Sequence, residues 1–151
     1  MTNLGTRGTV AGMEAMVEVL GEDESLRLIE RIEVGRIGFT GRYGPEVLPV
    51  NYKVVDGTIV FRTEADGALG QDLRTGIRGA EYKVAFEVDE VDTATRTGWS
   101  VMVQGAVHHV EDEAERAELT KIGIESWMSG ERSLFMRIMP TLITGRRINR
   151  R

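Results

Sequence analysis

Residues 49–63 read PVNYKVVDGTIVFRT and contain two apolar-rich runs that meet at Asp56-Gly57. In the first run apolar and polar residues alternate, so Val50 and Tyr52 fall on one face of a strand and Asn51 on the other. An Asp-Gly pair favours a two-residue type I′ turn, because both central residues of that turn take a positive φ. The stretch therefore predicts a β-hairpin with one face in a core.

Three polar side chains stand in this otherwise core-building hairpin: Asn51, Arg62 and Thr63. Arg62 follows Phe61 directly, so we expect it to be displayed on the opposite face and not buried in the same core. An arginine beside a hydroxyl, followed by the glycine-containing turn DGALG, can offer charged donors and backbone N–H groups to a phosphate. The alternative is an exposed strand arginine followed by an ordinary connection, and the pattern alone leaves both readings open.

The rest of the chain predicts more strands than helices. The predicted strands span residues 35–41, 46–55, 58–63, 82–91, 99–110 and 133–148. The predicted helices span residues 22–32, a short stretch within 66–79, and residues 111–127. Because the strands mostly follow one another through turns, the sheet should be largely antiparallel. We expect a mainly β (α+β) fold: a six-stranded antiparallel barrel with a few flanking helices, since a barrel closes its edges without parallel crossovers.

Three residues interrupt the strand pattern. Pro49 cannot donate a hydrogen bond to a sheet, so it should lie at an edge, at a bulge or where pairing stops. Gly105 predicts a bulge or a close approach of two backbones. Pro140 should bend or break the last strand.

Composition limits the class of protein. The chain has 151 residues, of which 41% are hydrophobic and 28% charged, which suits one globular domain. We expect residues 1–15 to be a flexible leader and residues 16–151 to form the domain. No apolar run approaches the ~20 residues that span a bilayer, and the start does not resemble a signal peptide, so we expect no membrane association and a cytoplasmic location.

Charge and cysteine content exclude several kinds of site. The chain has no cysteine, which removes disulfides, thiolate nucleophiles and cysteine-bound metals. The net charge of −5 argues against a nucleic-acid partner, which would need a basic face. Residues 145–151, GRRINRR, form a basic cluster that fits a solvated terminus better than a nucleic-acid contact, because no aromatic residues are interleaved with the arginines.

No catalytic side chain is predicted. His108 and His109 are adjacent on a strand and point to opposite faces, which favours a strand surface over a shared metal. The sequence contains no nucleophile elbow, no P-loop and no dinucleotide-binding glycine motif after a strand. Trp99 shares a face with Val101 and Val103, so it could pack in the core or lie near a planar cofactor.

Five segments in this order resemble one known family. They read ERIEVGRIGFT, PEVLPVNYKVVDGTIVFRT, VAFEVDEVD, TGWSVMVQGAV and IMPTLITGRRI. The chain resembles the pyridoxamine 5′-phosphate oxidase-like, flavin-binding split-barrel proteins, and within them the small actinobacterial-type members, from about residue 17 to residue 148. The resemblance implies a homodimer of split barrels with two cofactor sites at the subunit interface.

The resemblance also implies where the cofactor, FMN, would lie. The segment Val50-Asn51-Tyr52 would run beside the flavin ring, partly through backbone contacts. Arg62-Thr63 and the turn after them would hold the phosphate. That turn contributes Gly67, Ala68 and Leu69. The strand from Trp99 and Ser100 through Gln104 would lie near the site, in some members from the partner subunit.

One departure from the family concerns charge. Relatives often carry a lysine in the turn after the Arg-Thr pair, whereas this chain has GALG there. The residues that clamp pyridoxal phosphate in the true oxidases of the family have no match, so that activity is not expected. The resemblance therefore implies a flavin-dependent oxidoreductase with a small-molecule electron donor or acceptor. A deazaflavin-dependent reductase and a non-catalytic cofactor-binding or sensing protein are the alternatives.

Overall fold

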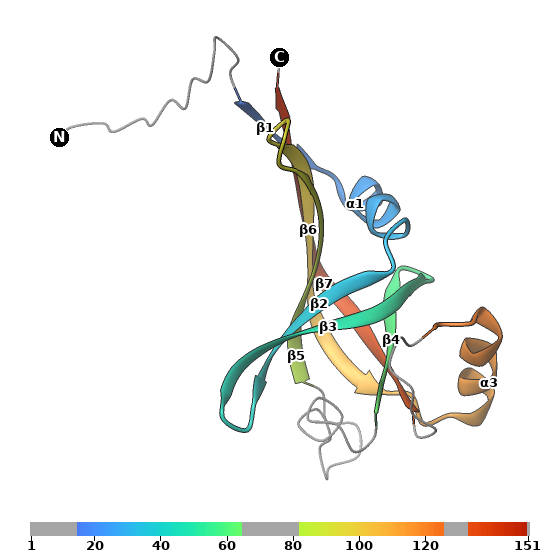
Figure 1. The fold of residues 1–151 in the computed structure, drawn as a ribbon. Helices are drawn as coiled ribbons and strands as arrows, with labels where there is room; N and C mark the ends of the chain where they lie inside the picture. Colours follow the sequence, from blue (N-terminus) through green and yellow to red (C-terminus); the bar gives the residue numbers. More distant parts are fainter. Residues whose placement is uncertain (1–14, 65–81, 126–132, 151) are drawn as a thin grey trace.

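A computed structural model describes residues 15–64, 82–125 and 133–150 of the chain (Figure 1). The strands are β1 (Ala15–Leu20), β2 (Val34–Gly41), β3 (Gly44–Val55), β4 (Thr58–Glu64), β5 (Tyr82–Asp92), β6 (Thr97–His109) and β7 (Ser133–Arg150). The helices are α1 (Glu22–Ile29) and α3 (Glu113–Ile122). The predicted short helix within 66–79 lies outside the described residues.

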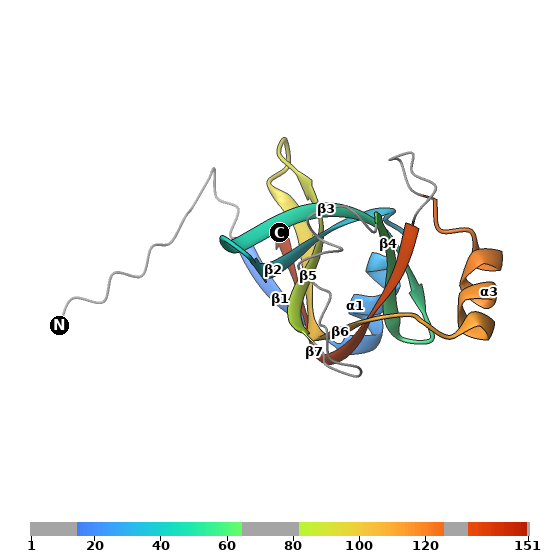
Figure 2. The ribbon, with the colours of Figure 1, turned by 90° about the horizontal axis from the view of Figure 1, so that it is seen from below.

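Six of these strands form a closed antiparallel ring, as the sequence predicts. The strand order is β1-β7-β4-β3-β2-β5-β6, and β6 also pairs with β7, which closes the barrel. β7 is long enough to pair with β6 along one edge and, along the other, with β4 through its first half and with β1 through its end. The strands wrap around a common interior in two perpendicular views (Figures 1 and 2).

The hairpin with its turn at Asp56-Gly57 forms as predicted. Asp56 and Gly57 have φ of 49° and 73°, as a type I′ turn requires. β3 and β4 pair from Tyr52–Phe61 to Val55–Thr58. Pro49 lies before that pairing begins and is paired with Arg36 of β2, so its missing N–H does not interrupt the β3–β4 ladder.

The main core fills the barrel with the apolar faces of the strands. Phe61 and Phe86 are fully buried, and the ring of Tyr52 meets that of Phe86 edge to face, with 4.8 Å between centroids. Burying such aromatic side chains contributes roughly 1.5–3 kcal/mol each. A second, smaller cluster lies outside the barrel, where α3 covers β4 (Figures 1 and 2). Its buried members are Val60, Val110, Leu119, Ile124 and Phe135.

Gly105 lies at a bulge, as predicted. The register of β6 against β7 shifts between Gln104 and Gly105. A Cβ placed on Gly105 would overlap the backbone carbonyl oxygen of Met139. Only glycine allows the two backbones to approach so closely, and the bulge bends both strands around the core.

The predicted helices are longer than the observed ones. α1 ends at Ile29, and α3 spans Glu113–Ile122, with Asp112 accepting a hydrogen bond from the Glu115 N–H at 2.9 Å as its N-cap. Gly123 ends α3 in the left-handed conformation, with φ of 72°. Among the described residues, no helix has the length and apolarity needed to cross a membrane.

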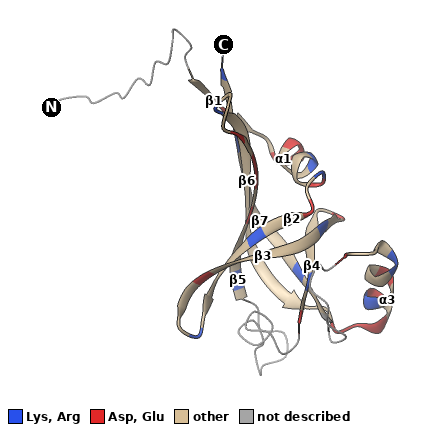
Figure 3. Ribbon diagram, viewed as in Figure 1, with Lys and Arg blue, Asp and Glu red and all other residues tan. Residues whose placement is uncertain are grey.

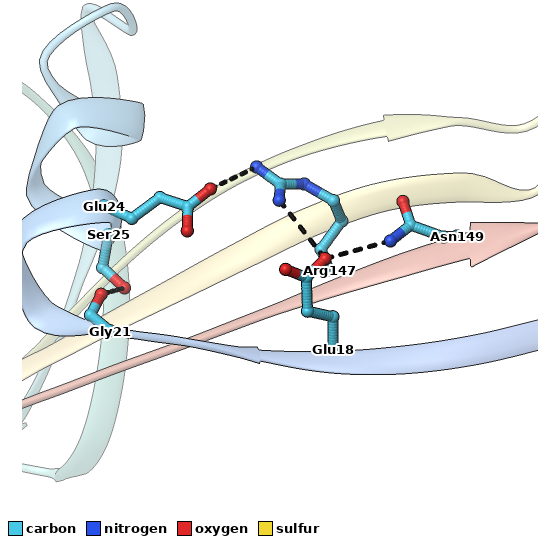
Figure 4. Close-up of polar contacts among 6 residues, drawn as sticks. All are labelled: Glu18, Gly21, Glu24, Ser25, Arg147 and Asn149. Atoms are coloured by element: carbon cyan, nitrogen blue, oxygen red, sulfur yellow. Dashed lines mark hydrogen bonds and ion pairs between the residues drawn. The ribbon is translucent and has the colours of Figure 1, made fainter.

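β1 was not predicted from the sequence. Residues 1–14 lie outside the described part of the chain, but Ala15–Leu20 pair in register with Arg150–Gly145 of β7. The basic end of the chain is therefore a strand up to Arg150. Arg147 ties three elements together (Figure 4): it lies 3.4 Å from Glu18 of β1 and 3.0 Å from Glu24 of α1. These two carboxylates raise the pKa of Arg147.

Candidate functional site

The hairpin places the predicted flavin-binding residues on two faces of the sheet. Val50 and Tyr52 point into the main core and are 8% and 3% exposed. The Tyr52 hydroxyl donates to the Ile29 carbonyl at 2.5 Å, which ties β3 to the end of α1, and burial raises the pKa of Tyr52. The side chains of Val50 and Tyr52 are thus part of the core, and a ligand would meet this segment through its backbone or through Asn51.

Asn51, Lys53 and Arg62 point to the outer face of the hairpin, toward the end of α3. The Arg62 guanidinium donates to the Ile124 carbonyl at 3.1 Å and lies 5.4 Å from the ring centroid of Phe135. The Lys53 ammonium donates to the Ile122 carbonyl, also at 3.1 Å. Both cations thus lie against carbonyl groups at the end of the helix, where positive charge is favourable.

Arg62 and Thr63 do not share a face. They are consecutive in β4, so Arg62 lies on the outer face while Thr63, which pairs with Leu134, faces the interior side. Both side chains are half-buried. Only a ligand lying across the end of β4 could contact both side chains. The turn residues Gly67, Ala68 and Leu69 lie outside the described part of the chain.

A small cavity of about 200 Å³ opens beside Asn51. Its lining includes Lys53 and the carboxylates Glu33 and Glu125. The volume is below the ~300 Å³ from which ligand pockets usually begin. This cavity is therefore too small to enclose a flavin ring system by itself, and its mixed charge is a poor match for a phosphate.

In the second predicted group, Trp99 and Ser100 lie far from Arg62. Trp99 pairs with Arg147 and Arg62 with Phe135, positions twelve residues apart along β7. At ~3.3 Å per residue, that is about 40 Å measured along the strand. The tip of the β5–β6 hairpin and the β4–α3 side lie at opposite ends of the molecule in Figure 1. Within one chain, Arg62 therefore does not share a site with Trp99 and Ser100.

Trp99 and Ser100 line a larger cavity at that far end. We call it the tip cavity; its volume is about 540 Å³, and it lies between β1, the β5–β6 turn and the end of β7. Trp99 is half-buried against the main core, which agrees with the packing reading, and it also contributes to the cavity wall. Ser100 lies on the outer face, paired with Arg146. Gln104 is exposed on the same face, nearer the bulge.

Two cations near these groups were not predicted as site residues. Arg146, an exposed residue of the basic cluster at residues 145–151, lines the tip cavity. Lys53 lies beside Asn51. Strand alternation could have found both, because Arg146 is two residues from Ile148 and Lys53 is two residues from Asn51.

A pair of acids on β5 has unusual electrostatics. Burial, a hydrogen bond with Asp89 and the charge of Asp89 together raise the pKa of Glu87 to about 7, while the charge of Arg36 opposes this rise. Charges elsewhere are mixed: both α1 and α3 carry acids and bases (Figure 3). Within the described residues, no group of three or more histidines and carboxylates is placed to hold a metal ion.

Comparison with known proteins identifies the family. The family model described as pyridoxamine 5′-phosphate oxidase matches residues 21–147. The chain belongs to this family. The family resemblance drawn from the sequence is thereby confirmed, and so is the mainly β, split-barrel fold.

Individual members of the family cover most of the chain. An uncharacterized protein of Mycobacterium tuberculosis, Rv0080, is 34% identical over 129 residues, which are 85% of this chain and 84% of that protein. The structure of an FAD binding protein from Mycobacterium smegmatis is 31% identical with a TM-score of 0.74, covering 87% of this chain and 98% of the other. A conserved protein of unknown function from Corynebacterium diphtheriae is 25% identical with a TM-score of 0.68, covering 86% and 96%.

Proposed function

We propose that this chain is a flavin-nucleotide-binding oxidoreductase that works as a homodimer, with each cofactor held between the hairpin of one copy and β6 of the other. The observation that carries the proposal is the separation of the two predicted groups. Arg62 and Trp99 pair with positions twelve residues apart on β7, which is about 40 Å along that strand. A second copy is needed to bring the two groups together.

The hairpin group supplies the charge that a nucleotide phosphate needs. Arg62 is half-buried and oriented by Ile124 and Phe135. A guanidinium that is already ordered loses less side-chain entropy on binding an anion than a free one. The M. smegmatis relative, which is 31% identical, is an FAD binding protein, and this supports a flavin in the present chain.

The outer face of the sheet supports self-association. One cross-strand row on this face runs through Leu142, Gln104, Ala85, Gly38 and Val47, since each is the register partner of the next. The row has an apolar side chain at each end, Leu142 and Val47.

Both ends of this row are open to solvent in the single chain: Val47 is 66% exposed and Leu142 47%. Large apolar side chains exposed on a sheet face are typical of a protein–protein interface. A two-fold axis near β5 would pair the face with itself, which is how an isologous dimer forms.

The residues would position the cofactor and would not react themselves. The bound flavin would supply hydride or electron transfer, as such cofactors do. Arg62 would hold the phosphate, and the backbone beside Asn51 would orient the ring. Ser100 and Gln104 of the second copy could donate to polar atoms of the ring. No side chain is assigned a role in proton transfer.

The cofactor can be identified directly. The chain, purified without added cofactor, should show flavin absorption bands, and chromatography of the released cofactor should give FMN or FAD. If no bands appear and neither flavin binds at micromolar concentration, the proposal fails. Parallel titration with a deazaflavin coenzyme separates the alternative cofactor, because tighter deazaflavin binding would reject the flavin assignment.

Activity is tested separately from binding. The GALG turn lacks the lysine common among relatives, and this favours a protein that binds its cofactor without turnover as the second candidate. Assays with reduced nicotinamide and a panel of electron acceptors distinguish the two. Detectable turnover supports the oxidoreductase. Flavin binding without turnover across the panel supports a storage or sensing role.

A further inference from the structure

The tip cavity has an apolar wall. Val17, Val91 and Ile148 line it from three different strands, and they are 64%, 64% and 41% exposed. Its volume of about 540 Å³ lies within the range of small-molecule sites, which run from ~300 to ~1,000 Å³. A second cavity of about 440 Å³ adjoins it and shares Val17, Ser100 and Arg146 with it.

Two arginines give this apolar cavity a positive rim. Arg96 and Arg146 both line it, and in the described part of the chain neither has an ion-pair partner. Asp92 also lines the cavity, but its carboxylate accepts from the N–H groups of Ala94 and Thr95 at 2.9 and 3.2 Å. That carboxylate therefore stabilises the turn, and the cavity keeps an excess of positive charge.

The turn holds Arg96 at a conformational cost. Arg96 has φ of 56°, a left-handed conformation that a side chain with a Cβ disfavours by roughly 1–2 kcal/mol. The hydroxyls of Thr95 and Thr97 lie 2.7 Å apart and help to order the same turn. Glycine or asparagine would relieve the strain, so the local conformation does not explain why an arginine stands here.

We propose that the tip cavity binds a small organic anion with an apolar body, whose negative group lies between Arg96 and Arg146. The apolar body would cover Val17, Val91 and Ile148, and the charge would face the guanidinium groups. Carboxylates and sulfonates attached to an aromatic ring or a short alkyl chain have this shape. The role of the anion as the substrate of the reaction rests on the proposed function, because Trp99 and Ser100 would then lie beside the flavin of the second copy.

The test uses two fluorescent probes that differ in charge. 8-Anilinonaphthalene-1-sulfonate is an aromatic anion, and N-phenyl-1-naphthylamine has a similar apolar body without the sulfonate. We expect the sulfonate to bind saturably, at one site per chain, and more tightly than the neutral probe. In a Trp127→Phe background Trp99 is the remaining tryptophan, so energy transfer to the probe reports binding near Trp99.

Matched variants assign the contacts. Arg146→Gln and Arg96→Gly should each weaken sulfonate binding about tenfold, as the loss of one charged hydrogen bond does. Neither should change the affinity for the neutral probe. Because glycine relieves the positive φ, Arg96→Gly should not lower the melting temperature, so weaker binding cannot be blamed on unfolding. Val91→Ser should weaken the binding of both probes.

The control removes an arginine elsewhere. Arg42 is exposed in the turn between β2 and β3, and Arg42→Gln should leave both affinities unchanged. Saturable binding that is equal in all the arginine variants would overturn the proposal. So would the absence of binding to the assembled protein, because the second copy would then fill the cavity.

The test of the anion site can be distinguished from the test of the proposed function. Arg62→Gln should weaken flavin binding and leave sulfonate binding unchanged. If the protein binds no flavin but the probes bind as expected, the anion site is supported and its role as a substrate site is rejected. If the protein binds flavin but the probes do not bind as expected, the anion site is rejected and the proposed function is not affected.

Discussion

The Arg62 guanidinium makes a structural contact and is also proposed to bind the ligand. It donates to the Ile124 carbonyl at 3.1 Å, and the proposed function also assigns it the phosphate of the cofactor. A carbonyl contact and a phosphate contact can be shared by one guanidinium, because it carries five N–H donors. Its substitution should therefore affect both binding and stability.

We predict that Arg62→Gln weakens flavin binding about tenfold to a hundredfold, since charged hydrogen bonds are worth ~1.5–3 kcal/mol. The free energy of unfolding should fall by about 1 kcal/mol, because the Ile124 carbonyl loses its donor. Fluorescence titration and urea denaturation measure the two effects. Arg42→Gln is the control, and equal flavin affinity in both variants would contradict the assignment.

Glu87 makes stability depend on pH. Burial and Asp89 raise its pKa to about 7, so the folded chain binds a proton more tightly than the unfolded chain does. A raised pKa contributes stability that is fully present below the ordinary pKa of the carboxyl and is lost as the pH rises through about 7. The Glu87 side chain is partly exposed, so solvent screens its charge and the effect on stability is moderate.

We predict that the melting temperature falls between about pH 4.5 and about pH 7.5, and that Glu87→Gln makes the fall smaller. The amide can still donate to Asp89 but cannot ionise. Thermal denaturation at fixed protein concentration and several pH values measures this. Glu90→Gln, which removes an exposed carboxylate of the same strand, should leave the pH dependence unchanged. A Glu87→Gln profile parallel to the unmodified one would refute the prediction.

At the scale of the element, β6 and β7 are shaped by the bulge at Gly105. We predict that Gly105→Ala lowers the free energy of unfolding by about 1–3 kcal/mol, because the new Cβ overlaps the Met139 carbonyl and the strands must separate. Chemical denaturation measures the loss. Gly21→Ala is a matched control, since a Cβ on Gly21 would have no atom within 4 Å. Similar losses in both variants would show that the close approach is not the cause.

The boundaries of the strands and helices show which structural features a local sequence pattern can predict. The Asp56-Gly57 turn, the strands on either side of it and the bulge at Gly105 follow from turn chemistry and alternation, and they could be predicted. β1 could not, because six residues with mostly exposed side chains become a strand only by pairing with the opposite end of the chain. The helices were predicted too long, because apolar spacing continues past the residues at which the chain leaves the helix.

At the scale of the whole molecule, the outer face of the sheet predicts the oligomeric state. We expect a homodimer in solution, and Val47→Lys and Leu142→Lys should each shift it to a monomer, because each places a charge at one end of the same apolar row. Flavin affinity should fall in both variants, since the two halves of the site would no longer meet. Light scattering coupled to size-exclusion chromatography measures the mass.

The control for this experiment is Ile122→Lys, which adds a charge to a side chain of α3 that is 37% exposed and is not part of the Leu142–Val47 row. It should leave the mass unchanged. A monomeric unmodified protein, or dimers in both row variants, would refute the shared site. In that case the Trp99 group and the Arg62 group would have to function separately.

The sequence by itself determined the hairpin, the antiparallel barrel, the family and the face on which each candidate side chain lies. These depend on alternation and turn residues, which act over a few positions. Only the tertiary structure decided that Arg62 contacts the end of α3, that Arg146 and Trp99 line one cavity, and that Arg62 and Trp99 lie beside opposite ends of β7. These relations join residues far apart in the chain, so they depend on strand register and barrel closure, and no local pattern records either.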